Sequence, residues 1–408
     1  MELKIVSDKP ILRRSPLIYL PLLSSLFSNL IYGLAGGQEN SFSYIVTILL
    51  FLHIATYLGK VRVNTNVLIL FLLVSISFMF RTFNLDYGNE NIGIGLLHGF
   101  QVCVKILIIA IIYPEVKKLS SLEIEIIFKD FVKILVCVIV FSMPLFILAS
   151  NELIHLSNRF IAIAEVESYR YGGLGFETLD FAYCAIVGLL LILSETKIKS
   201  TKKILLFLMV GASLYLTKSN FMVVALGSIF LFVFTHWAMN GSVYKKLIYF
   251  VSILLMTLIL LNMNTVILGL FFSRFSELEV GTSLGERILP GLNLLNHYFN
   301  NFGYLKLPAP GISIAEIINN STNYISFNAW GVSKVLTDFG ILGIPAVILL
   351  FFIGSRFLRD AYGNLLINSV GIVSLAYIFA QAGYMNYTAI TLLMLTFRHN
   401  KIRKSNNI

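Results

Sequence analysis

The feature that most constrains this chain is a series of nearly charge-free apolar runs, each roughly 15–24 residues long, that recur from one end to the other. A helix needs about 20 apolar residues to cross the hydrocarbon core of a bilayer. Only 13% of the 408 residues are charged, which is about half the share in an ordinary soluble domain. The composition excludes a soluble globular enzyme, a disordered chain and a disulfide scaffold, and it predicts an all-α, polytopic transmembrane bundle.

We expect twelve spans within one integral membrane domain, residues 1–408, with ten or eleven as the alternative count because several runs are short. The N-terminal basic stretch enters the first run without a small-residue cleavage site, so that run reads as a retained span. The predicted spans are 16–35, 41–58, 66–80, 92–113, 130–150, 179–195, 203–217, 220–239, 246–263, 331–354, 366–381 and 384–397.

The basic residues predict the orientation of these spans. With a cytoplasmic N-terminus, 22 of the 31 Lys and Arg fall in inside segments, seven fall outside and two lie within spans. Cytoplasmic loops carry an excess of Lys and Arg, so this uneven division favours both termini in the cytoplasm. The net charge of +10 is then mostly an orientation signal, and it requires no nucleic-acid partner.

Two outside segments are long, 151–178 and 264–330, whereas the inside loops are short. An enzyme that works at the outer face of the membrane needs such segments, whereas a carrier binds its substrate near the middle of the membrane. In the first segment, Arg170 precedes a glycine turn at 172–175. One guanidinium group can bind two phosphate oxygens at once, so the pattern favours a phosphate or sugar-phosphate ligand. The alternative is that Arg170 pairs with Glu167 or Glu177 and only pins the loop.

The second long segment contains an amphipathic helix pattern around Arg287 and His297. We expect this helix to lie on the outer face of the membrane that the chain spans, with both side chains turned toward solvent or a cavity. A merely solvated polar face is the alternative, and Pro290 requires either a kink or a start there. The apolar stripe, with spacings of three and four, is Leu284, Ile288, Leu292, Leu295, Phe299 and Phe302.

Further along, Asn328, Lys334 and Asp338 lead into the predicted span 331–354. An ionisable group inside a span is a functional candidate by default, which singles out Asp338. The alternative is that Lys334 and Asp338, four residues apart on a helix, neutralise each other. The chain has no Walker A, HExxH, G-x-S-x-G or Cys/His metal-ligand pattern, so we expect neither a metal nor a cofactor.

Three segments resemble the bacterial O-antigen polymerase (Wzy-type) and O-antigen ligase superfamily. Tyr169-Arg170-Tyr171-Gly172-Gly173 looks like the family's Arg-Gly segment before a central span. The Gly-Glu-Arg ending at Arg287, followed by the helix and a Pro-Gly, is similar to its large-loop signature. Asn328, followed by the run that begins at Asp338, resembles its closing segment. The order of spans and long outer loops matches over nearly the whole chain.

The resemblance implies a GT-C-like architecture in the bacterial inner membrane. It further implies metal-independent polymerisation of repeat units, carried on undecaprenyl pyrophosphate, into O-antigen or capsular polysaccharide. The implied partners are the lipid-linked oligosaccharide, the bilayer and a chain-length regulator protein. Two alternatives stay open. An O-antigen ligase is expected to have a His beside Asn328, where this chain has Phe327, and a flippase or other transporter is expected to carry more ionisable groups deep within its spans than Lys105.

For the transfer reaction, our hypothesis gives the candidate residues three roles. Arginines at the outer surface stabilise the departing pyrophosphate by fixed positive charge, a second group activates the acceptor hydroxyl, and aromatic side chains stack on sugar faces. The leading arginines are Arg170 and Arg287, with Arg159 and Arg274 as secondary contacts. The candidates for activating the hydroxyl are His297 and Asp338. The substrate-binding candidates are Tyr169, Tyr171, Asn328 and Trp330.

Overall fold

The computed structural model describes residues 15–34, 108–109, 111–151, 153, 170–174, 178–195, 198–219, 221–240, 343–359, 365–380 and 386–406. Within these ranges every regular element is helical and no β-strand occurs. The predicted all-α class is therefore confirmed for this part of the chain. The predicted spans 41–58, 66–80 and 246–263 lie outside the described residues, so the count of twelve stays a prediction.

Each of the following helices overlaps a predicted apolar run. Their bounds are α1 Pro16–Leu34, α5 Ser121–Ser150, α6 Thr178–Ser194, α7 Ser200–Leu216, α8 Phe221–Asn240, α14 Gly343–Arg359, α15 Leu365–Ala380 and α16 Tyr387–Asn406.

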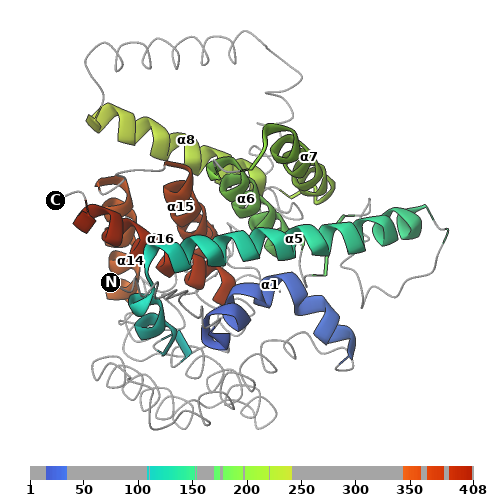
Figure 1. Ribbon diagram of the computed structural model, residues 1–408, viewed down its shortest axis with the longest axis horizontal. Helices are drawn as coiled ribbons and strands as arrows, with labels where there is room; N and C mark the ends of the chain where they lie inside the picture. Colours follow the sequence, from blue (N-terminus) through green and yellow to red (C-terminus); the bar gives the residue numbers. More distant parts are fainter. Residues whose placement is uncertain are drawn as a thin grey trace, which may run out of the picture.

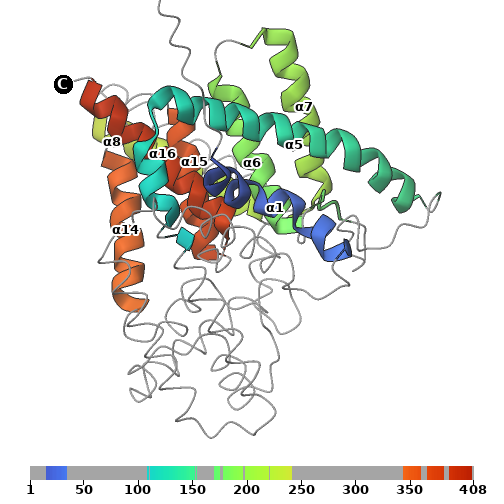
Figure 2. The same cartoon turned by 60° about the horizontal axis from the view of Figure 1, so that its bottom comes forward.

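Helices α6 and α15 form the middle of the described bundle. Helix α6 packs against α1, α5, α7, α8 and α15, while α15 also packs against α8, α14 and α16. The long α5 crosses the other helices from the side of the C-terminus, and α1 runs beside it (Figure 1). Figure 2 shows α14 at the edge of the bundle, apart from α5. The first and last described helices are neighbours, because α1 packs against α16.

Helix α5 begins well before the predicted span, at Ser121 instead of residue 130, because its start is capped. The Ser120 hydroxyl accepts from the backbone N–H of Glu123 at 3.3 Å, and the Glu123 carboxylate accepts from the backbone N–H of Ser120 at 2.8 Å. This reciprocal capping box satisfies backbone donors that the first helical turn otherwise leaves without partners. The helix therefore starts in the polar segment that precedes the apolar run.

Glycine allows α5 and α6 to approach closely at one point. A Cβ on Gly188 of α6 would overlap the end of the Leu135 side chain of α5 and touch Val210 of α7. Leu135 and Val210 are both fully buried, so neither has free space to move into. Gly188 thus permits the close approach of α5 and α6.

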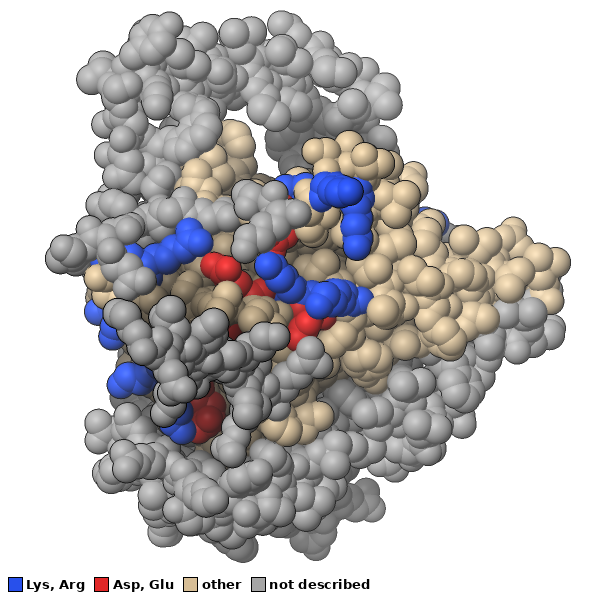
Figure 3. All heavy atoms as spheres, viewed as in Figure 1, with Lys and Arg blue, Asp and Glu red and all other residues tan. Residues whose placement is uncertain are grey.

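Charged side chains join α5, α6, α7 and α16 at one end, and we call this the basic end. It consists of the start of α5, the end of α6, the start of α7 and the end of α16. Lys129 of α5 pairs with Glu195 at 2.9 Å, and Arg403 of α16 lies 3.7 Å from Glu125 of α5. Lys203 of α7 donates to the carbonyl of Leu193 at 2.7 Å. Figure 3 shows charged side chains over this part of the surface, while the outermost right-hand part is tan.

The side chain of Thr388, from α16, forms hydrogen bonds with the backbone of α1 next to Pro21. Proline has no N–H and breaks the helical ladder. The Thr388 hydroxyl donates to the Pro21 carbonyl at 3.2 Å and accepts from the backbone N–H of Ser25 at 3.1 Å. A side chain inserted into the ladder bends a helix, and α1 bends in Figure 1. These bonds fix α1 against the start of α16.

Much of the outward surface of the described helices is apolar. Judged by length and composition, one of the described helices, α5, is long and apolar enough to cross a membrane. Shorter apolar stretches occur at Pro16–Phe27, Thr178–Ser194, Val224–Val233, Val347–Arg356 and Leu365–Ala380. Large apolar side chains point outward from α5, α7, α8 and α14, among them Phe141, Leu205, Leu208, Leu231, Phe351 and Phe352, each at least 62% exposed.

Candidate functional site

The segment 170–174 is held against three helices by Tyr171. Its backbone N–H donates to the Leu216 carbonyl at the end of α7, at 3.0 Å. Its ring is fully buried, edge-on to Phe146 of α5 at 5.2 Å and to Phe181 of α6 at 4.9 Å between centroids. Edge-to-face aromatic pairs contribute stability beyond their buried area. Tyr171 therefore fixes the backbone position of its neighbour, Arg170.

The phenol of Tyr171 is paired with Ser142 of α5, and the two oxygens lie 2.5 Å apart. The Ser142 hydroxyl donates to the Val138 carbonyl at 2.6 Å, so the Tyr171 hydroxyl is the donor to Ser142. Burial raises the pKa of Tyr171 to about 12. At neutral pH the phenol is accordingly uncharged and acts as a hydrogen-bond donor.

These contacts give Tyr171 the role of an anchor, and its predicted part in sugar stacking finds no support in them because both faces of the ring are covered. Gly173 has a packing role as well. Its φ of +62° is the left-handed conformation that favours glycine, and a Cβ there would lie 2.5 Å from the Phe181 ring. A glycine at position 173 therefore allows this turn to lie directly against the Phe181 ring.

Arg170 is half-buried, and its Nε is buried without a hydrogen-bond partner in the described part of the chain. A buried donor left without a partner costs about 1–3 kcal/mol. A ligand anion that bound the guanidinium would remove this cost. The alternative partners predicted for Arg170, Glu167 and Glu177, lie outside the described residues.

Most of the other predicted site residues also lie outside the described ranges, so their positions relative to Arg170 stay predictions. They are Arg159, Tyr169, Arg274, Arg287, His297, Asn328, Trp330 and Asp338.

A polar chain that the sequence analysis did not single out joins the end of α15 to the starts of α6 and α16. The Tyr377 hydroxyl of α15 donates to the Asp180 carboxylate of α6. The Asn386 amide donates to the Tyr377 oxygen at 3.4 Å and to the Ser25 hydroxyl of α1 at 2.9 Å. Asn386 also caps α16, because its side-chain oxygen accepts from the Ala389 N–H at 3.0 Å. We call these residues the Asp180 chain.

The Asp180 chain rests on aromatic packing. The ring of Tyr377 stacks on Tyr183 of α6 at 4.4 Å between centroids, and Phe221 of α8 lies edge-on to it at 5.3 Å. Asp180 lies within the predicted span 179–195, and an ionisable residue in a span is the signal that would have pointed to it. Because Asp180 immediately precedes Phe181, it is adjacent in sequence to the residue that packs against Tyr171.

The described residues contain no group of three or more His, Cys, Asp or Glu side chains placed to hold a metal ion. Among known proteins, no family model matches the chain and no curated protein is similar to it. The likeness to the O-antigen polymerase superfamily therefore rests on the quoted motifs and on the predicted order of spans and long outer loops.

Proposed function

We propose that this chain is an integral membrane glycosyltransferase. It would polymerise oligosaccharide repeat units, carried on undecaprenyl pyrophosphate, into O-antigen or capsular polysaccharide at the outer face of the cytoplasmic membrane. The reaction would use fixed cationic side chains of the protein and no metal.

The outward apolar surface supports the membrane part of this proposal. Soluble monomers rarely expose contiguous apolar patches larger than a few hundred Å², and outward-facing Leu205 and Phe351 are among many such side chains here. The basic end supports the predicted orientation with cytoplasmic termini. The Lys and Arg residues that are expected in the cytoplasm lie at helix ends that contact one another. Arg170 belongs to the opposite end, since Tyr171 is bonded to Leu216, the last residue of α7.

The observation that carries the proposal is the state of Arg170. The next residue, Tyr171, is held by contacts with α5, α6 and α7, and the buried Nε of Arg170 has no hydrogen-bond partner among the residues that the structure describes. A permanently charged, planar donor group that extends from a held backbone position and can still form hydrogen bonds suits a lipid pyrophosphate. Little reorganisation is then needed when negative charge develops on the leaving group.

In the proposed reaction, a hydroxyl oxygen of the acceptor sugar bonds to the anomeric carbon of the donor glycan. The bond from that carbon to the pyrophosphate oxygen breaks, and its electron pair leaves with undecaprenyl pyrophosphate. The hydroxyl proton passes to a basic side chain, for which His297 and Asp338 are the candidates. Arg170 and Arg287 stabilise the negative charge that grows on the pyrophosphate.

The test is the polysaccharide ladder that cells produce with Arg170→Ala or Arg170→Lys. Loss of one preorganised donor costs about 3 kcal/mol of barrier, roughly a hundredfold in rate. The ladder should therefore collapse to a single-repeat band in Arg170→Ala, with little rescue by lysine, which lacks the planar fork.

The matched control is Lys202→Ala, an exposed cation near the start of α7, which should leave the ladder intact. An unchanged ladder in Arg170→Ala at normal protein levels would contradict the role given to Arg170. A complete absence of capped core, instead of single-repeat caps, would point to a ligase.

A transporter of lipid-linked oligosaccharide is the second candidate, favoured by two groups in the bundle. Asn368 of α15 and Thr391 of α16 are buried, and their side-chain polar atoms lack hydrogen-bond partners in the described structure. Polar groups inside spans mark transport pathways. Cells without a transporter would retain the repeat unit on the cytoplasmic side, whereas cells without a polymerase would still display single repeats.

A further inference from the structure

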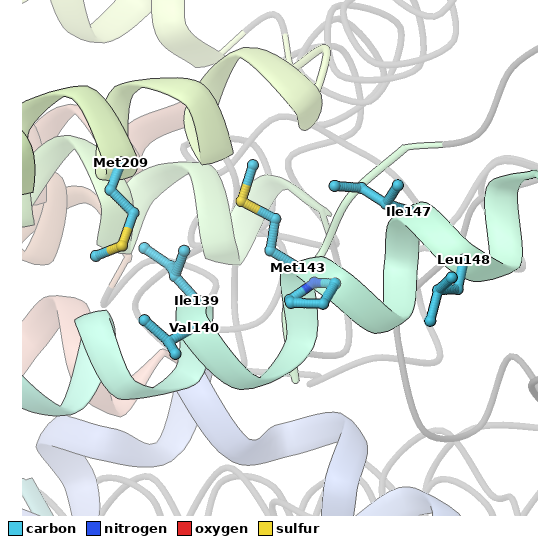
Figure 4. Close-up of a pocket in the computed structure, with 7 residues that line it drawn as sticks. Ile139, Val140, Met143, Ile147, Leu148 and Met209 are labelled. Carbon is cyan, nitrogen blue, oxygen red and sulfur yellow. The ribbon is translucent and has the colours of Figure 1, made fainter.

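An apolar groove of about 520 Å³ runs along the outer half of α5, beside α7. Figure 4 shows Met209 extending from α7 toward α5, where Ile139 and Met143 point back toward it. Every residue that lines the groove is apolar: Ile139, Val140, Met143, Pro144, Ile147, Leu148 and Met209. Ile147 is 45% exposed and Leu148 38%, so the groove is open to the surroundings of the bundle.

The same two helices that form the groove also bind Tyr171, the residue after Arg170. Ser142, which precedes the groove residue Met143, is the hydrogen-bond partner of Tyr171. On the other wall, Met209 lies seven residues before Leu216, which is about 10 Å along a helix, and Leu216 accepts from the backbone of Tyr171. The residue after Arg170 is thus bonded to both walls of the groove.

Two cationic residues lie close in sequence to the residues that make these bonds, Arg170 before Tyr171 and Lys218 after Leu216. The buried Nε of Arg170 has no partner among the described residues. Lys218 lies two residues after the end of α7, is exposed and has a φ of +48°. An apolar groove whose two walls bond to the residue after an arginine complements an amphiphile that has a long hydrocarbon chain and an anionic head.

We infer that the α5–α7 groove holds the first isoprene units of a polyprenyl chain whose phosphate head is bound by Arg170. The identity of this lipid rests on the proposed function, while the site itself rests on the groove and on the buried Nε of Arg170, which has no partner among the described residues. Two of the lining residues are methionines, whose flexible side chains adapt to an irregular surface such as a methyl-branched chain. The groove would thereby place the sugar-bearing end of the lipid at the outer end of α5 and α7.

The test uses the purified full chain in lipid nanodiscs with a diazirine-bearing farnesyl pyrophosphate as photoreactive probe. Crosslinked peptides should map to residues 139–148 and to Met209. Unlabelled undecaprenyl phosphate should compete with the probe, and phosphatidylglycerol at the same concentration should not. Equal competition by phosphatidylglycerol, or labelling spread evenly over α8 and α14, would overturn the inference in favour of an ordinary lipid-facing surface.

A matched pair of variants gives a second readout. Leu148→Trp fills the groove and should lower crosslinking about tenfold, the effect of about 1.4 kcal/mol in binding. Leu349→Trp makes the same change on α14, at a side chain that is 60% exposed and away from the groove, and should leave crosslinking unchanged. Equal crosslinking in both folded variants would contradict the inference.

The two proposals fail in different ways. If cells without this chain keep their polysaccharide ladder while crosslinking remains specific to the groove, the proposed function fails and the prenyl site stands. If Arg170→Ala abolishes the ladder but no crosslink reaches α5 or α7, the proposed function stands and the groove assignment fails.

Discussion

At the scale of single residues, Arg170 and Tyr171 are neighbours in opposite environments. Tyr171 is buried, and its hydroxyl and backbone N–H are hydrogen-bonded, whereas Nε of Arg170 has no partner in the described part of the chain. A loop tyrosine beside an arginine predicts either a ligand contact or a packing anchor, and only the positions of Phe146 and Phe181 decide between them. The sequence pattern around Arg170 indicated that the arginine binds a ligand. It did not reveal that the contacts of Tyr171 hold the segment in place.

The Ser142–Tyr171 pair should respond asymmetrically to substitution. Ser142→Ala leaves the Tyr171 hydroxyl buried without a partner, at a cost of about 1–3 kcal/mol, whereas Tyr171→Phe removes the hydroxyl that needs a partner and costs about 1 kcal/mol. Adding Tyr171→Phe to Ser142→Ala should therefore restore stability. Thermal unfolding of the purified variants in detergent measures this, and a double variant less stable than Ser142→Ala would refute it.

A second residue-scale prediction concerns His399, near the end of α16 and beyond the predicted span 384–397. Burial and the nearby Arg403 lower its pKa, against an opposing effect of Glu125, whose Oε1 lies 3.9 Å from His399 Nε2. Below about pH 6.5 the unfolded chain takes up a proton that the folded chain does not. The folded state should consequently lose stability as the pH falls through that range.

The measurement is the unfolding temperature of the wild-type protein and of His399→Gln, taken at several pH values on both sides of 6.5. Glutamine does not titrate, so the variant should lose part of the pH dependence. Identical pH profiles for the two proteins would show that His399 contributes none of it.

At the scale of elements, hydropathy located the described helices but not all of their ends. Helix α5 starts early because Ser120 and Glu123 form a cap, and α16 extends past residue 397 into a basic tail. That tail is held by tertiary contacts, including the Arg398 guanidinium, which donates to the Leu119 carbonyl at 3.1 Å. A search for apolar runs detects the membrane-length core of a helix and misses polar turns that caps and neighbours stabilise.

The helix packing can be tested at two glycines. Gly188→Leu should destabilise the fold by about 1–3 kcal/mol, since the new side chain must displace buried Leu135. The matched control is Gly211→Leu on α7, where a Cβ has nothing within 4 Å. There, removing a mid-helix glycine should leave stability unchanged or raise it by about 0.5–1 kcal/mol. Equal unfolding temperatures for the two variants would contradict the close approach of α5 and α6.

At the scale of the whole molecule, the described helices have two distinct ends. One is the basic end, and the other carries Arg170, the groove and the Asp180 chain. The sequence predicted the division of charge, because loop composition follows a simple rule. It did not reveal the Asp180 chain, since Tyr377 and Asp180 are 197 residues apart and Asn386 and Ser25 are 361 apart. Contacts of that range follow from the packing of helices, on which local patterns carry no information.

The central claim is that a cation at the end opposite the basic end binds a lipid pyrophosphate. Its most direct test is the affinity of the purified chain in nanodiscs for undecaprenyl pyrophosphate, compared between wild type, Arg170→Ala and Lys202→Ala. Loss of a charged hydrogen bond of about 1.5–3 kcal/mol should weaken binding about ten- to a hundredfold in Arg170→Ala. Lys202→Ala should bind like the wild type. Equal affinity in all three folded proteins, or weakening only in Lys202→Ala, would contradict the account.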